Sequence, residues 1–111
     1  MNIAVFGDTI IDRHMTINSV KENYEQSGTL KANVSFRHTT PGGAANVAVN
    51  VQALSKFGPN DNAVTLYTAG ARGDDYAIVR EQLLLAGVTP IVSSTRVRPV
   101  IKCRITNNDI T

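Results

Sequence analysis

The stretch TTPGGAANVAVNVQALSKFG, residues 39–58, places a glycine pair directly in front of an apolar run with helical spacing. Glycine has no Cβ, so the main chain at such a pair can approach another group very closely. The helix that follows presents unpaired N–H groups and the positive end of its dipole at the same place. A phosphate, a sugar hydroxyl or a neighbouring strand fits this description, and the stretch alone leaves all three open.

Helical spacing continues over residues 44–57, and the pair Gly58 and Pro59 forms a strong stop after it. The apolar positions of this segment fall on one face with two alanines beside it: Val47, Val51, Leu54, Ala44 and Ala48. The sequence therefore predicts one helix that begins at the glycine pair and buries this face.

Short apolar runs lie on both sides of this helix, at residues 2–6, 62–70 and 88–94. Uninterrupted apolar runs of this length are typical of strands buried in a parallel sheet. A second helix is predicted over residues 75–86, with Gly87 just after its end. The apolar residues of that helix are Val79, Leu83 and Ala86 on one face, with Ile78 and Leu85 nearby. The order βαβαβ predicts an α/β fold with a parallel sheet and helices on its faces.

Two other segments, residues 29–37 and 96–105, alternate apolar and polar side chains. Alternation indicates strands with one wet face, and we expect them to form a small antiparallel sheet outside the main core. Cys103 falls on the apolar side of its strand, so we expect it to be buried and inert. Residues 18–28 are polar and predict a mobile connection.

Composition limits the class of protein. The 111 residues are enough for one domain, and 42% apolar with 18% charged residues is ordinary for a globular chain. A formal charge of +2 is too small to indicate nucleic acid as the main partner. The start MNIAVFGD lacks a basic leader, no stretch approaches a membrane span, and a single cysteine excludes an internal disulfide. We therefore expect a soluble, cytoplasmic protein with no membrane contact.

The glycine pair matches neither familiar phosphate loop, because the lysine of G-x-x-x-x-G-K-[ST] and the spacing of G-x-G-x-x-G are both missing around it. Close strand–helix packing is one alternative. The other is a ligand whose hydroxyls meet backbone N–H groups and the amide of Asn46, which can both donate and accept. Asp8 and Asp12 follow the first strand, where a carboxylate accepts sugar hydroxyls well, although either could cap a turn or be solvated.

Four basic residues form the polar side of the last segment: Arg96, Arg98, Lys102 and Arg104. A solvated strand face is the simplest interpretation, and binding of a substrate phosphate is the sharper one. His14 and His38 have no carboxylate or cysteine at ligand spacing, so we predict no metal site.

Taken together, VFGDTIID, PGGAANVAVNVQALSKFG, GARGDDYAIVREQLLLAGV and TRVRPVIKCRI resemble the N-terminal part of a ribokinase-like (PfkB-type) carbohydrate kinase. Within that family they most resemble the kinases that act on heptose 7-phosphate in bacterial lipopolysaccharide precursor synthesis. The resemblance covers nearly the whole chain, with residues 18–36 matching least. It implies a single partial ribokinase-like domain, with a core at 1–11 and 40–94 and a β-lid at 12–39 and 95–111.

The resemblance also implies roles for particular residues. Asp12 matches the aspartate that binds sugar hydroxyls, and the glycine-rich sugar loop corresponds to Gly42, Gly43 and Asn46. Asp8 and Lys102 match a further acidic position and a basic lid position, and we include both as substrate-binding candidates. The alternating strands match the β-lid, which closes over the sugar and often forms the dimer contact.

The sequence departs from the family at the catalytic aspartate, because it contains no G-A-G-D motif. In the family this motif supplies the base and the anion hole, and the ATP site lies beyond it. The resemblance therefore implies sugar binding without phosphoryl transfer by these residues alone, with no catalytic residue assigned. ATP and Mg²⁺ are expected only for a complete kinase.

Three interpretations stay open at this point. One is part of a sugar kinase; another is a non-catalytic protein that binds sugar or works through its lid; the weakest is a small nucleotide-binding domain. In the first two we expect a homo-oligomer, formed through the lid or through an exposed sheet edge.

Overall fold

A computed structural model describes residues 1–22, 30–57, 62–71, 73–96 and 99–107. The chain divides into two compact units. The first unit comprises residues 1–12 and 39–102, and the second comprises residues 13–38 and 103–111. Each is described by itself below. None of the described helices is long and apolar enough to cross a membrane.

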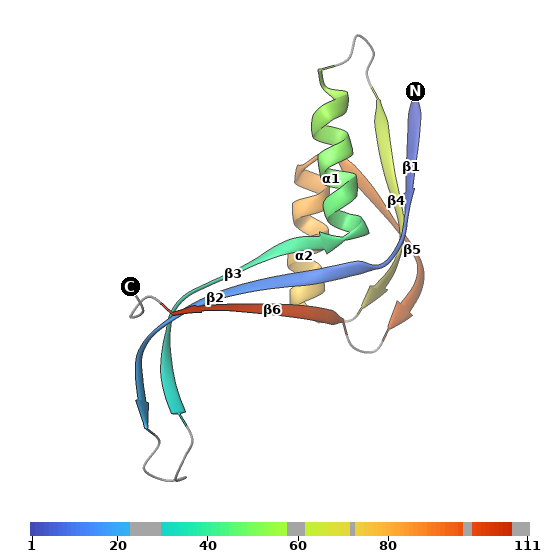
Figure 1. Cartoon of the computed structure of the whole chain (residues 1–111). Helices are drawn as coiled ribbons and strands as arrows, with labels where there is room; N and C mark the ends of the chain where they lie inside the picture. Colours follow the sequence, from blue (N-terminus) through green and yellow to red (C-terminus); the bar gives the residue numbers. More distant parts are fainter. Residues whose placement is uncertain (23–29, 58–61, 72, 97–98, 108–111) are drawn as a thin grey trace. The chain divides into compact units, whose positions relative to one another are not determined.

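The first unit contains a parallel sheet of strand order β1-β4-β5 (Figure 1). Its strands are β1 (Asn2–Phe6), β4 (Ala63–Ala71) and β5 (Val88–Arg96). Ile3 of β1 lies opposite Val64 of β4, which in turn lies opposite Val88 of β5. These three strands confirm the apolar runs that the sequence predicted.

Two helices cover one face of this sheet, as Figure 1 shows. Helix α1 (Ala44–Ser55) packs on β1 and β4, and α2 (Asp74–Leu85) packs on β5. The buried hydrophobic core between helices and sheet consists of Ile11, Ala45, Ala48, Val64, Leu66, Tyr76, Val79, Leu83 and Val88. The order βαβαβ is therefore confirmed, although helices lie on only one face of the sheet in the described residues.

The buried face of α1 is only partly the predicted one, since Ala44, Ala48 and Val51 pack in the core as predicted. Ala45 and Ala48 are fully buried, whereas Val47 is 51% and Leu54 70% exposed. Small side chains let the helix axis approach the sheet closely, so the alanines rather than the larger residues face the strands. On α2, Val79 and Leu83 are buried as predicted, while Leu85 is 82% exposed.

A second sheet has the order β3-β2-β6. Its strands are β2 (Thr9–Glu22), β3 (Leu30–Gly43) and β6 (Val100–Asn107). Strand β2, which the sequence did not predict, lies between the two predicted strands. Neighbouring β2 and β3 run in opposite directions, but β6 runs in the same direction as β2 (Figure 1). The sheet is therefore mixed rather than purely antiparallel, because β6 enters it from the end of β5.

Three predictions along this sheet need correction. Residues 18–22 belong to β2 rather than to a mobile connection, and residues 23–28 lie outside the described part. The segment 96–105 is not one strand, since β5 ends at Arg96 and β6 begins at Val100. Cys103 is exposed, because both sides of β6 are open to solvent in the described chain. The predicted stop at Gly58 and Pro59 lies outside the described residues.

The Tyr76 hydroxyl offers a test of the core. The residue is 8% exposed, and its oxygen finds no hydrogen-bond partner among the described atoms. Burial raises the pKa of Tyr76 above its ordinary value, and the charge of Arg80 lowers it in part. The unfolded tyrosine therefore loses its proton first, so stability should fall as the pH rises above about 10.

We expect Tyr76→Phe to raise the free energy of unfolding at pH 7 by about 1 kcal/mol, since it removes a desolvated hydroxyl without a partner. We also expect a shallower loss of stability above pH 10. Urea unfolding from pH 7 to alkaline pH measures both effects, with Tyr67→Phe, at a more exposed tyrosine, as the control. Lower stability of Tyr76→Phe at pH 7 would show that the hydroxyl has a partner.

Candidate functional site

The carboxylate of Asp12 lies directly against the main chain of Gly42. A Cβ placed on Gly42 would stand 2.6 Å from Asp12 Oδ2 and 3.1 Å from the carbonyl oxygen of Ile10. Gly42 is buried and Asp12 half-buried, at the neighbouring ends of β3 and β2. No described residue forms an ion pair or hydrogen bond with this carboxylate. Glycine therefore leaves this space to the carboxylate, which a side chain at 42 would displace.

The second glycine makes the turn from β3 into α1. Gly43 is the N-cap of the helix, with φ 59° and ψ −134°, a conformation that residues with a Cβ rarely adopt. A Cβ on it would lie 2.6 Å from the carbonyl oxygen of Asp8. The glycine pair thus serves close packing at 43 and leaves room for a carboxylate at 42.

The N-terminus of α1 is only partly open. The Ala44 N–H donates to the Asp8 carbonyl at 3.0 Å, and no side chain caps the helix. The next amides belong to Ala45 and Asn46, and Asn46 is exposed on this first turn. Main-chain N–H groups at this end of a helix suit a hydroxyl or an anion.

This junction is fixed to the core by two contacts. The Thr9 and Thr68 hydroxyls share a buried hydrogen bond of 2.8 Å, which joins the start of β2 to β4. A Cβ on Gly7 would lie 2.8 Å from Ala44 Cβ, so Gly7 lets α1 sit against the end of β1. The sequence did not predict a role for either threonine. A single threonine at the start of one strand and another inside a second strand are common in any sheet, so the sequence carries no distinctive signal for this pair.

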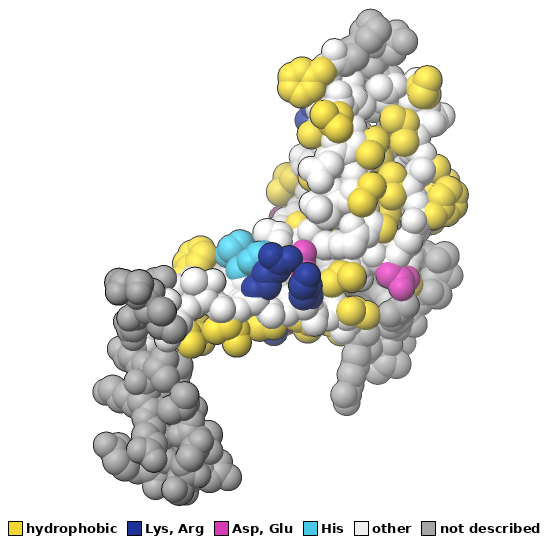
Figure 2. All heavy atoms as spheres, viewed as in Figure 1, with side chains coloured by type: hydrophobic (Ala, Val, Ile, Leu, Met, Phe, Trp, Pro, Cys, Tyr) yellow, Lys and Arg dark blue, Asp and Glu magenta, His cyan; other side chains and the backbone are white. Residues whose placement is uncertain are grey.

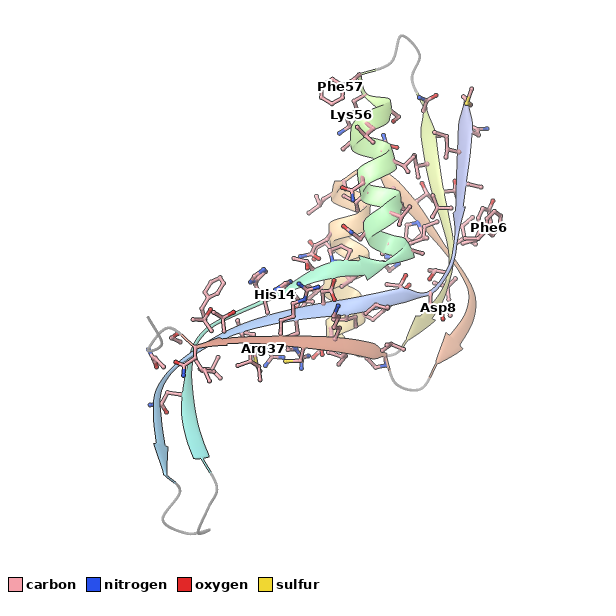
Figure 3. The ribbon with its side chains drawn as sticks, viewed as in Figure 1. Phe6, Asp8, His14, Arg37, Lys56 and Phe57 are labelled. Carbon is pink, nitrogen blue, oxygen red and sulfur yellow. The ribbon has the colours of Figure 1, made fainter. Side chains whose placement is uncertain are left out.

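The six predicted site residues therefore fall into two groups. Asp12 lies against Gly42, Gly43 follows as the N-cap of α1, and Asn46 lies in the first turn of that helix. Asp8 is exposed where β1 leads into β2 (Figure 3), and its main-chain carbonyl accepts a hydrogen bond from the first amide of α1. Lys102 is exposed on β6, the strand beside β2, and no described contact joins its ammonium group to Asp12 or the glycines.

The predicted basic face is not a single surface of one strand. Arg96 ends β5, Lys102 and Arg104 lie on β6, and Arg98 is outside the described residues. Lys102 and Arg104 are both exposed.

The second unit holds an arrangement that the sequence did not reveal. The rings of His14 on β2 and His38 on β3 stack at 4.6 Å with an interplanar angle of 10°, and Phe36 lies against His38 at 5.4 Å. Strand pairing brings together histidines that are far apart in sequence. In the described part of the chain, no three His, Cys, Asp or Glu side chains are grouped to hold a metal ion.

Comparison with protein-family models gave no match, and comparison with curated protein sequences gave none either. Solved structures do match. A carbohydrate kinase from Agrobacterium tumefaciens superimposes with a TM-score of 0.67 at 22% identity, over 97% of this chain and 32% of that one. A ribokinase from Thermotoga maritima gives 0.65 at 20% identity, over 98% and 33%.

A nucleoside kinase from Methanocaldococcus jannaschii, an archaeal member of the ribokinase family, gives 0.61 at 19% identity, over 97% and 33%. The chain thus has a partial ribokinase-like fold, and it spans about one third of the length of the solved kinases it matches. The fold expectation is confirmed, while nothing in these matches singles out heptose kinases.

The two glycines should respond differently to substitution. Gly43→Ala should destabilise the protein by on the order of 1–3 kcal/mol, since its φ is unfavourable and its Cβ would meet a main-chain oxygen. Gly42→Ala should cost less, because the Asp12 side chain can rotate away. Urea unfolding measures both.

A double-mutant cycle isolates the contact at Gly42. Gly42→Ala should be better tolerated in an Asp12→Ala background than in the wild-type protein, because the clashing carboxylate is gone. An equal cost in both backgrounds would contradict the geometry described above.

Proposed function

We propose that this chain forms the sugar-binding part of a ribokinase-type carbohydrate kinase. The observation that carries the proposal is the Asp12 carboxylate held against the Gly42 main chain at the start of α1. A carboxylate accepts hydrogen bonds from two vicinal hydroxyls, and helix N–H groups donate to their oxygens. Asn46, exposed on the first helical turn, supplies an amide that does both.

In this proposal the residues orient an acceptor hydroxyl and take no part in proton transfer. Phosphoryl transfer depends chiefly on positioning and on stabilising charge around the moving group. The catalytic aspartate motif of the family is missing from this sequence, so we assign no catalytic residue. We propose that ATP and Mg²⁺ are used only by the complete enzyme, whose cytoplasmic location would suit an ATP-dependent reaction.

The second unit would act as the lid. Strands that extend from the sugar-binding junction can close over a bound sugar and exclude water, which protects the donor from hydrolysis. Lys102 and Asp8 would then contact the sugar or its phosphate at the edge of the site. Resemblance in sequence favours heptose 7-phosphate as the first ligand to test, and the comparisons support only the broader class of sugar kinase ligands.

Sugar binding can be measured without catalysis. Heptose 7-phosphate, or another member of a panel of sugars and sugar phosphates, should raise the melting temperature of the chain. Asp12→Asn should weaken that ligand about 10- to 100-fold, since a hydrogen bond to a charged group contributes about 1.5–3 kcal/mol. Asp74→Asn makes the same charge change at an exposed position and should leave binding unchanged.

A coupled assay for ADP release should give no signal with the 111 residues alone. Absence of any thermal shift across the panel would remove the sugar-binding assignment. Equal weakening by Asp12→Asn and Asp74→Asn would assign the effect to net charge rather than to the site.

A second candidate function, self-association through the lid, is favoured by one observation. The second unit exposes apolar side chains, with Val34 53%, Phe36 58% and Ile105 60% accessible. Exposed apolar patches of this kind commonly mark contacts between proteins. We propose a homodimer formed through this surface.

Val34→Glu and Ile105→Glu should convert the dimer to a monomer, because each buries a charge in the apolar contact. Size-exclusion chromatography with light scattering measures the mass, and Asp12→Ala should leave it unchanged. A wild-type chain that stays monomeric at high micromolar concentration would contradict this second candidate.

A further inference from the structure

One face of the β1-β4-β5 sheet has no cover among the described residues. Phe6 of β1 lies opposite Tyr67 of β4, which lies opposite Ile91 of β5, so the three side chains form a row across this face. They are 73%, 37% and 44% exposed, and the rings of Phe6 and Tyr67 stack at 4.9 Å. Phe6 points away from both helices in Figure 3, and hydrophobic side chains reach the surface in this part of the molecule in Figure 2.

Strand β1 stands at the end of the strand order, so within the described ranges no strand pairs with its outer edge. Edge strands in proteins are usually protected by charged residues, proline or a bulge. β1 reads NIAVF and has none of these. Its apolar residues lie on both faces: Ile3 and Val5 are half-buried under α1, while Ala4 and Phe6 are exposed. This is the composition of an internal strand covered on both faces.

The size of this surface argues against a second copy packed face to face. Three strands of five residues span about 14 Å by about 17 Å, on the order of 250 Å². A stable interface buries about 800 Å² on each partner. A partner that uses both the outer edge of β1 and the bare face buries a larger area. It pairs a strand with β1 and also covers the sheet with a helix.

We propose that the β1 edge and the row formed by Phe6, Tyr67 and Ile91 are the docking surface for the rest of a ribokinase-like fold. The partner is an α/β polypeptide that pairs a parallel strand with β1 and packs an apolar helix on the row. Recognition comes from main-chain hydrogen bonds along β1 and from burial of neutral side chains. The matched kinases are about three times as long as this chain. The part of such a kinase that this chain does not cover is therefore long enough to form the partner.

This inference rests on the proposed function. The docking surface and the sugar site nevertheless involve different residues, so variants separate the two. Phe6→Lys should leave the ligand-induced melting shift of the chain intact, and Asp12→Asn should leave assembly intact.

The test uses a defined probe: the two thirds of the Agrobacterium tumefaciens carbohydrate kinase that this chain does not cover, coexpressed with the full 111-residue chain. We expect a 1:1 complex by light scattering and slower hydrogen exchange at the β1 amides. Phe6→Lys and Ile91→Lys should each weaken the complex at least about 10-fold. Phe57→Lys changes a phenylalanine that is 89% exposed at the end of α1, and should have no effect.

The remaining third of that kinase, coexpressed with the same probe, is the positive control. The proposal is overturned if the control assembles and this chain does not, or if the complex forms without protection of β1. It is equally overturned if Phe6→Lys and Ile91→Lys assemble like the wild type, or if β1 is protected only in a homodimer of this chain.

Discussion

The lack of a Cβ at Gly42 and Gly43 is the constraint on which the rest of this structure depends. They let the end of β3 lie against the Ile10 and Asp8 carbonyls at the start of β2, with no room for a Cβ. The same approach positions α1, whose first amide donates to Asp8. One close contact between main chains therefore fixes where the start of β2 and the end of β3 meet α1.

That junction joins folding to the proposed chemistry. The Asp12 carboxylate occupies the space that a side chain at 42 would take, so the requirement for glycine and the placement of a ligand-binding group are the same steric fact. The buried bond between Thr9 and Thr68 holds the junction to β4. This bond holds the strands that carry the junction, while the Asp12 side chain itself keeps its rotational freedom.

The sheet beneath this junction is covered on one face only in the described residues. Its helices bury Val64, Leu66 and Val88, whereas Phe6 and Tyr67 remain accessible on the other face. The proposed site thus stands beside a sheet that still offers apolar surface and a strand edge among the described residues. The proposed sugar binding and the proposed completion of the fold would for this reason be separate properties, carried by separate residues.

The sequence by itself determined the elements of the first unit and the importance of the glycine pair. Apolar runs and glycine stops are local signals, so β1, β4, β5 and both helices could be predicted from them. Strand β2 was not predicted at all, because its residues 18–22 are polar and pairing with neighbouring strands decides its conformation.

Only the tertiary structure decided which residues meet. It brought Asp12 to Gly42, thirty positions later, and stacked His14 on His38. It also placed Ala45 and Ala48, not Val47 and Leu54, against the sheet, and left Cys103 exposed. Periodicity fixes which side chains share a face, but the distance between packed elements selects the face that is buried, and that distance depends on residues far apart in the chain.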